Sequence, residues 1–230
     1  METLASPEFG RVSGAFHPLR LVEKNPGVGR QMRRETKIRI TVSSSRSLAL
    51  AAVFGALYAA LVIAFAPFSN LPIQVRVADV LMPLAILFGR PVIFGLGIGA
   101  VAGNFFADSI TGFPSAFVPL DMVGGSLVNL LAGFLAWKIG QYDWRVRSRN
   151  ASWFIATVVE TAMISVVVGG YLSIVFTYTA LAVSILLVLA GEIVAINIGG
   201  YALLNVVGRG KTLDLFRSWG LKIYAAQRDQ

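Results

Sequence analysis

The stretch "RVADVLMPLAILFGRPVIFGLGIGAVAG", residues 76–103, decides how many times this chain crosses a membrane. Two apolar runs meet in it, at 75–89 and 91–107, and together they have the length of one long helix. The letters "GRPV" at 89–92 divide them, because glycine readily ends a helix, arginine prefers water, and proline suits the first turn of a new helix. We therefore predict two short helices here instead of one long helix.

The rest of the chain is equally apolar. Its 230 residues are 56% hydrophobic and only 14% charged, a balance that points to lipid as the surrounding solvent. Further apolar runs lie at 47–68, 117–138, 152–176 and 179–207, and each reaches about the 20 residues that a helix needs to cross a bilayer. The sequence thus predicts an all-α integral membrane protein with a six-helix membrane domain over residues 47–207.

Basic segments flank this domain. Residues 1–46 are rich in Arg, Gly, Pro and Ser and are expected to form a flexible tail, and residues 208–230 a short basic tail. With six spans, every Lys and Arg except Arg76 falls on the same side as both termini. The positive-inside preference then predicts a multi-pass protein of the cell membrane with both termini cytoplasmic. The net charge of +8 is explained without nucleic acid, although such tails can also contact the lipid bilayer.

The sequence lacks the residues that several kinds of metal site and active site require. The chain has no cysteine, and its single histidine, His17, lies in the first tail, so no metal site is expected. "GRGKT" at 208–212 ends like a phosphate-binding loop, but the glycine that this motif requires is replaced by Asn205. Neither HExxH nor GxSxG occurs. We expect no catalytic residues and no cofactor, so the chain is not predicted to be an enzyme.

A few polar residues interrupt the apolar domain and are the candidates for a binding site. A carboxylate facing lipid costs roughly 2.5–3.5 kcal/mol, so these groups should face the bundle interior. On the six-span topology most of them lie near the outer face, with Glu192 near mid-depth. Asn104 and Asp108 are expected at the outer end of the third span, and residues 108–116 are expected to be external. They are Arg76, Asp79, Asn104, Asp108, Asp121, Asn129, Glu160, Glu192 and Asn197.

Each candidate also has a purely structural interpretation. Glu192 can bind substrate, or it can hold helices together through an ion pair or hydrogen bond. Arg76 and Asp79 are three residues apart and can share a helix face, either as part of a site or as an interfacial salt bridge. Glu160, nearer the inner surface, fits a contact within the bundle better than a site.

Small residues form a second pattern in the first apolar run. Alanines recur every fourth residue at Ala52, Ala56, Ala60 and Ala64, and a parallel row runs through Ala51, Gly55 and Ala59. Such a smooth face lets another helix approach closely in lipid. That helix can belong to the same bundle or to a partner protein.

Three segments carry a family resemblance. They are "RVADVLMPLAILFGRPVIFGLGIGAVAGNFFAD" at 76–108, "PLDMVGGSLVNLLAGFLAW" at 119–137 and "LAGEIVAINIGGYALL" at 189–204. In this order they resemble the QueT-type membrane proteins, the substrate-capture (S) components of energy-coupling factor (ECF) transporters for queuosine precursors. The resemblance covers about residues 47–207.

Membership would imply an S-component bundle of six helices that binds a 7-deazaguanine-like heterocycle. Its partners would be a membrane coupling protein and two ATPase subunits, and Ala52, Ala56, Ala60 and Ala64 would form the docking face for the coupling protein. Position by position, the resemblance implies a ligand-contacting set. That set is Arg76, Asp79, Asn104, Asp121 and Glu192. The sequence departs from the family at Asp79, where Glu is more usual, and in its long basic tail.

Two other functions stay open at this point. An autonomous secondary transporter or channel for a small organic solute is one, although no repeat relates 47–107 to 117–207 as such carriers often show. The other is a non-transporting membrane scaffold that recruits partners through the alanine face.

Overall fold

The computed structural model describes residues 26–69, 75–146, 149–177 and 179–224. It divides into two units, Met1–Arg39 and Ile40–Gln230. Helix α1 (Pro26–Ala64) begins well before residue 47, so 26–46, expected to be flexible, are helical here. The physical reason is that Arg, Lys, Gln, Glu and Met in this stretch are good helix formers and no proline follows Pro26. Residues 1–25 and 225–230 of the two expected tails lie outside the described residues.

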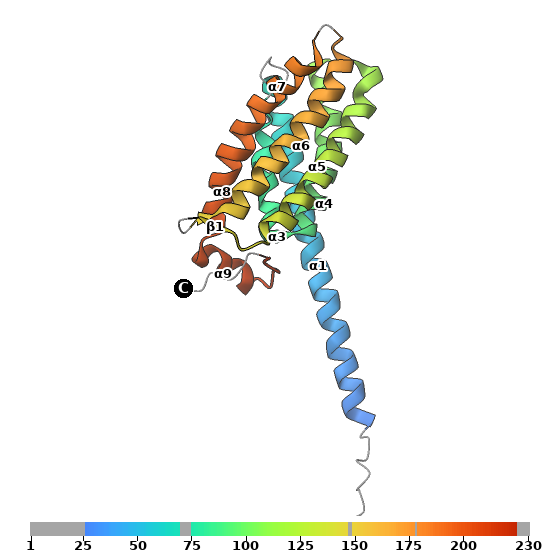
Figure 1. Cartoon of the computed structure of the whole chain (residues 1–230). Coiled ribbons are helices and arrows are strands. Elements are labelled where there is room, and N and C mark those ends of the chain that lie inside the picture. Colours follow the sequence, from blue (N-terminus) through green and yellow to red (C-terminus); the bar gives the residue numbers. More distant parts are fainter. Residues whose placement is uncertain (1–25, 70–74, 147–148, 178, 225–230) are drawn as a thin grey trace, which may run out of the picture. The chain divides into compact units, whose positions relative to one another are not determined.

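The second unit is a bundle of helices (Figure 1). Among the described residues, five helical segments are long and apolar enough to cross a membrane. They are Ser45–Ala64 of α1, α4 (Arg90–Thr111), η2 with α5 (Ser115–Phe117 and Val118–Gly140), α6 (Ala151–Val175), and the continuous run of α7, η3 and α8 (Leu181–Glu192, Ile193–Gly200 and Tyr201–Val207). Each coincides closely with an apolar run of the sequence.

The sixth expected span is shorter than a membrane-crossing helix. It consists of the 3₁₀ segment η1 (Val77–Leu84) followed by α3 (Ala85–Phe88). At about 2.0 Å per residue in η1 and 1.5 Å in α3, this helix is roughly 22 Å long, against about 30 Å of hydrocarbon. The prediction of six transmembrane helices is therefore met only in part, with five.

The division at "GRPV" is confirmed. Gly89 separates α3 from α4 with a φ of 66°, a value that L side chains rarely adopt, and Pro91 lies in the first turn of α4. A side chain at position 89 would also meet the rings of Tyr224 and Trp137.

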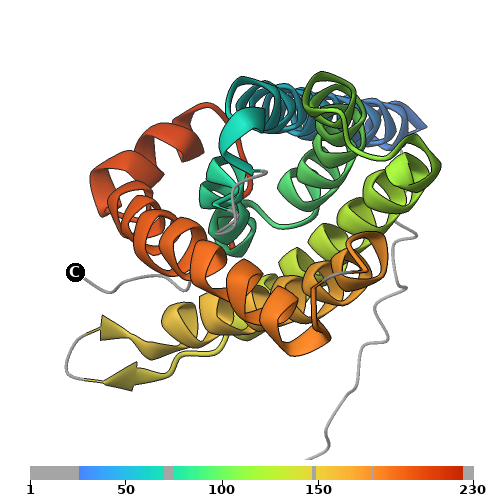
Figure 2. The same cartoon turned by 90° about the horizontal axis from the view of Figure 1, so that it is seen from above.

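The short helix η1–α3 lies inside the bundle. Figure 2 shows the other helices arranged around it. Its residues Ala78, Met82, Ala85 and Ile86 have no solvent exposure. Its two ends lie beside opposite ends of α5. Arg76, just before η1, pairs with Asp121 in the first turn of α5, and the side-chain amide of Gln141, after the last turn of α5, donates to the carbonyl oxygen of Ile86.

Small elements complete the second unit. They are α2 (Ala66–Ser69), the antiparallel two-residue strands β1 (Arg145–Val146) and β2 (Arg149–Asn150), and α9 (Gly210–Ser218).

Polar and apolar groups are distributed as expected in lipid, because buried carboxylates lie inside while large apolar side chains face outward. Outward-facing examples on three helices are Phe94, Ile98, Leu131, Val166 and Ile174.

Glycines allow α4 to pack directly on α1. A Cβ at Gly99 would lie 2.5 Å from the carbonyl oxygen of Gly55, and one at Gly55 would lie 2.9 Å from the carbonyl oxygen of Gly95. The row through Ala51 and Gly55 is thus used inside the bundle, as close helix packing in lipid requires.

We predict that Gly99→Ala lowers the unfolding temperature of the purified protein in detergent. The added methyl group would overlap the backbone of α1, and overpacking of this kind costs about 1–3 kcal/mol. The matched control is Gly170→Ala on α6, where an added Cβ meets nothing within 4 Å; this variant should be as stable as the parent or slightly more so. An equal effect of the two substitutions on the unfolding temperature would contradict the close packing of α1 on α4.

Candidate functional site

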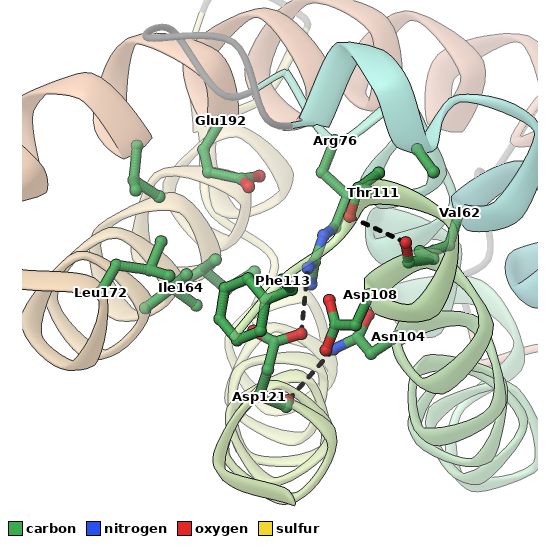
Figure 3. A pocket seen from close by; sticks show the side chains of 14 residues that line it. Val62, Arg76, Asn104, Asp108, Thr111, Phe113, Asp121, Ile164, Leu172 and Glu192 are labelled. Carbon is green, nitrogen blue, oxygen red and sulfur yellow. Dashed lines mark hydrogen bonds and ion pairs between the residues drawn. The ribbon is translucent and has the colours of Figure 1, made fainter. Parts of the chain in front are cut away.

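A pocket lies at the end of the bundle where α1, α4 and α6 end and where η1, α5 and α7 begin (Figure 3). Its empty volume is about 620 Å³, counting the part that is open to the surroundings. The polar residues of its wall are Arg76, Asn104, Asp108, Thr111, Asp121 and Glu192. Apolar side chains, among them Val62, Phe113, Ile164 and Leu172, form the rest. A wall in which apolar side chains surround several converging polar groups is typical of a small-molecule site.

Asp121 organises the polar side of the pocket. Its Oδ2 lies 3.9 Å from Nη2 of Arg76, and its Oδ1 accepts a hydrogen bond of 2.6 Å from the hydroxyl of Tyr171 on α6. Its backbone oxygen accepts from Nδ2 of Asn104 at 3.1 Å. Asp121 lies in the first turn of α5, Asn104 on α4, Tyr171 on α6, and Arg76 just before η1. This network therefore joins four helices at one point.

A glycine makes room for the network. A Cβ at Gly125, one turn after Asp121, would lie 2.8 Å from Nδ2 of Asn104 and 3.7 Å from Nη1 of Arg76. Next to it, the hydroxyl of Ser126 donates to the carbonyl oxygen of Gly97 at 2.8 Å and ties α5 to α4. The "DMVGGS" stretch therefore supplies the charge, the space and the inter-helix contact that the polar side of the pocket needs.

Asp79 lies one step deeper than the pocket wall. It is fully buried, and its Oδ1 accepts a short hydrogen bond from the hydroxyl of Tyr58 on α1. The same hydroxyl accepts from Nδ2 of Asn129 on α5 at 2.7 Å. The carboxyl group of Glu192 lies beside that of Asp79. Glu192 is thus both part of the pocket wall and connected to the core.

Three acceptor oxygens of the pocket wall have no hydrogen-bond partner in the described structure. They are Oδ1 of Asn104, Oδ2 of Asp108 and Oε2 of Glu192, and all three are buried. The amide orientation of Asn104 is fixed by its donation to Asp121, so an oxygen and not a nitrogen is left without a partner. Leaving a buried acceptor unsatisfied costs about 1–3 kcal/mol, so each of these atoms is a place where a donor on a ligand gains free energy.

The structure brings four of the five expected ligand-contacting residues together in one pocket, namely Arg76, Asn104, Asp121 and Glu192. The fifth, Asp79, lies directly behind Glu192. Arg76 forms its ion pair with Asp121, which lies on another helix. Figure 3 shows Arg76, Asp121 and Glu192 directed toward a common space.

The position that the sequence predicts for Asp108 is wrong. The sequence placed it at the outer end of the third span, where 108–116 were expected to be an external segment, but it is a buried residue of α4. The reason is that α4 continues to Thr111 and ends at Gly112, which adopts the left-handed conformation and donates its N–H to the carbonyl oxygen of Asp108. Asp108 therefore belongs to the pocket wall.

Sequence reasoning also missed the two tyrosines, Tyr58 and Tyr171. Each is buried and donates to a carboxylate of another helix. Their only signal is that a buried tyrosine hydroxyl in an apolar helix needs a partner, which does not identify the partner.

Two other polar residues, Asn197 and Glu160, lie in the bundle outside the pocket wall. Asn197, in the π-helical segment η3, accepts a hydrogen bond from Thr161 and donates one to Thr157, both on α6. Glu160 on α6 is fully buried, and neither of its carboxyl oxygens has a hydrogen-bond partner. No group of three or more His, Cys, Asp or Glu is placed to hold a metal ion within the described ranges.

The four alanines at 52, 56, 60 and 64 point away from the bundle. All four are exposed, whereas Gly55, Tyr58 and Val62 on the other face of α1 are buried. Ser45–Ala64 is also the least buried of the five long spans, with 11% of its most apolar window buried against 33–56% in the others. The alanine face is thus free of packing within the described chain.

The comparison with protein families settles the class of the molecule. The model of the QueT transporter family matches residues 48–209, which include four of the five spans completely, most of the first, and every residue of the pocket. The chain belongs to the QueT transporter family. It is a multi-pass membrane transporter with a small-molecule substrate, from a family of transporters and not of enzymes. The resemblance seen in the sequence is confirmed. No curated protein and no solved structure matched the chain.

Proposed function

We propose that this QueT family member is the substrate-binding membrane subunit, or S component, of an ECF-type importer. Its ligand would be a queuosine precursor of the 7-deazaguanine class. The observation that carries the ligand class is the set of buried acceptor oxygens at Asn104, Asp108 and Glu192, which receive no donor from the described residues. They call for a compact molecule rich in N–H groups.

A 7-deazaguanine offers such a donor pattern. Its ring N–H and amino groups can donate to a carboxylate and an amide oxygen, and its flat ring can pack against Phe113 and the aliphatic wall. Arg76, the one basic residue among the described residues of the wall, can donate to the ring carbonyl. An aminomethyl cation on the ring would balance the carboxylate of Asp108 or Glu192, because Arg76 already balances Asp121.

Calorimetric titration of the purified protein with 7-aminomethyl-7-deazaguanine tests this ligand assignment. Glu192→Met removes the acceptor while keeping an unbranched side chain, so we expect affinity to fall by about 1.5–3 kcal/mol, the value of one charged hydrogen bond. Glu192→Gln should lose less, because its amide can donate to Asp79 while its carbonyl oxygen still faces the ligand. Asp108→Asn should also weaken binding.

Asp214→Asn is the matched control for these titrations. Its carboxylate lies on α9, is exposed and pairs with Arg217, far along the chain from the pocket wall. It should bind like the parent. Parental affinity in Glu192→Met would show that this carboxyl group serves the bundle and not the substrate. Parent protein that binds no 7-deazaguanine at all would refute the ligand class.

The exposed alanine face of α1 supports a docking role toward the coupling protein of the importer. Ala56→Trp should prevent co-purification with that protein and its two ATPase subunits, because a bulky ring blocks close helix approach, yet leave ligand affinity unchanged. Val166→Trp, at an exposed position of α6, is the control and should co-purify normally. Normal co-purification of Ala56→Trp would exclude this face as the docking site and favour an autonomous transporter.

We further propose six passes with both termini cytoplasmic, the short helix η1–α3 crossing within the bundle. The positions of its ends beside opposite ends of α5 support this topology. The chain contains no cysteine, so Ser109→Cys and Ser218→Cys can be labelled selectively with a membrane-impermeant maleimide. In intact cells Ser109→Cys should react and Ser218→Cys only after permeabilisation. Reaction of both in intact cells would contradict the topology.

A further inference from the structure

A second cavity lies at the opposite end of the bundle from the pocket. Its empty volume is about 550 Å³, including space open to the surroundings. The wall comes from the start of the apolar part of α1, the turn between α3 and α4, and the segment after α9. The lining residues are Arg46, Ser47, Leu50, Phe88, Pro91, Gly220, Leu221, Lys222 and Tyr224. This cavity is not part of the substrate pocket and shares no residue with it.

The cavity combines two cations with an apolar wall. Arg46 comes from α1 and Lys222 from the segment after α9, so charges far apart in the sequence meet at one cavity. The described lining includes no carboxylate, which leaves the two positive charges without a counter-ion in the wall. Leu50, Phe88 and Leu221 supply the apolar part. A pair of cations over an apolar surface suits an anion that is attached to a hydrocarbon chain.

The segment after α9 is fixed in place, so the cavity has a defined wall. The backbone N–H of Tyr224 donates to the carbonyl oxygen of Leu87 at 2.8 Å, and its ring meets Trp137 edge to face at 5.2 Å. Gly220, with a φ of 72°, turns the chain after α9. The ammonium group of Lys222 lies 4.7 Å from the centre of the Tyr224 ring.

Aromatic and basic residues at this end place the cavity at a membrane interface. Trp144 and Trp219 are exposed, and the side chains of Arg90 and Lys138 lie over the ring of Trp137. Tryptophan, together with basic side chains that cover aromatic rings, is typical of the headgroup level of a bilayer. Leu50 and Leu221 in the wall of the cavity offer a surface for an acyl chain.

We propose that this cavity binds the phosphate headgroup of an anionic phospholipid. Arg46 and Lys222 hold the phosphate, and the acyl chains pass over Leu50 and Leu221. Basic pockets at helix ends are known to hold such headgroups, and each Lys or Arg near a membrane surface strengthens the attraction. A free phosphate ion would use the two cations but would gain nothing from the apolar wall. This inference does not depend on the identity of the transported substrate.

Native mass spectrometry of the full chain, offered equal amounts of dioleoylphosphatidylglycerol and dioleoylphosphatidylcholine in detergent, tests the proposal. The parent should retain phosphatidylglycerol preferentially. In the double variant Arg46→Gln/Lys222→Gln, the amount of retained phosphatidylglycerol should fall about tenfold or more. The matched control Arg209→Gln/Lys211→Gln removes two cations from the start of α9, outside the cavity, and should behave like the parent. Lys222→Gln alone should show a smaller loss, which keeps the test informative if the double variant misfolds.

Three results would overturn the proposal. Equal retention of the two lipids by the parent would exclude recognition of the anionic headgroup. Equal losses in the cavity variant and the control would indicate attraction to the general positive charge of this end. Displacement of phosphatidylglycerol by inorganic phosphate would show that the cavity binds the free ion and not a lipid.

Discussion

The packing of one twelve-residue helix, Val77–Phe88, inside the bundle determines how most of the other helices are arranged. Its side chains are buried on all sides, so every neighbouring helix must present a surface that fits it. Gly200 allows the last span to approach: a Cβ there would lie 2.8 Å from Pro83. Because the helix is short, the chain before it enters the bundle in an extended conformation at Arg76. That entry brings Arg76 to Asp121 and forms one wall of the pocket.

The buried carboxyl groups explain why the pocket lies where it does. A carboxyl group inside a membrane bundle is stable only with hydrogen-bond partners or with a proton. Asp121 has both an ion pair and a tyrosine hydroxyl, and Oδ1 of Asp79 accepts a hydrogen bond from Tyr58. Asp108 and Glu192 each keep a buried oxygen without a partner, and both face the pocket. Asp79 and Glu160 also keep unpaired oxygens, but these residues lie outside the pocket wall, so Asp108 and Glu192 are the described acids whose unpaired oxygens a ligand can reach.

The sequence predicted the membrane domain well because lipid imposes simple rules. Apolar length and the turn at Gly89 located the apolar spans to within a few residues. The bounds of the second helix were predicted closely but its geometry was not, since composition does not reveal that 77–84 form a 3₁₀ segment that includes Pro83. Arg76, Asn104, Asp121 and Glu192 stood out because polar groups are rare in these spans. Their mutual contacts, and those of Tyr58 and Tyr171, depend on which helix faces meet, which periodicity alone does not determine.

The two faces of α1 connect the pocket to the outside of the bundle. Tyr58 on the inner face donates a hydrogen bond to Asp79, Asp79 lies beside Glu192, and Glu192 lines the pocket. The opposite face carries Ala56 and Ala60, which are exposed. A ligand that donates to the unpaired oxygen of Glu192 would change the electrostatic environment of Asp79, and through Asp79 it would affect the hydrogen bond that Tyr58 donates. Occupancy of the pocket and the position of α1 would then be linked. In the importer proposed above, such a link would let a partner protein distinguish the loaded state from the empty one.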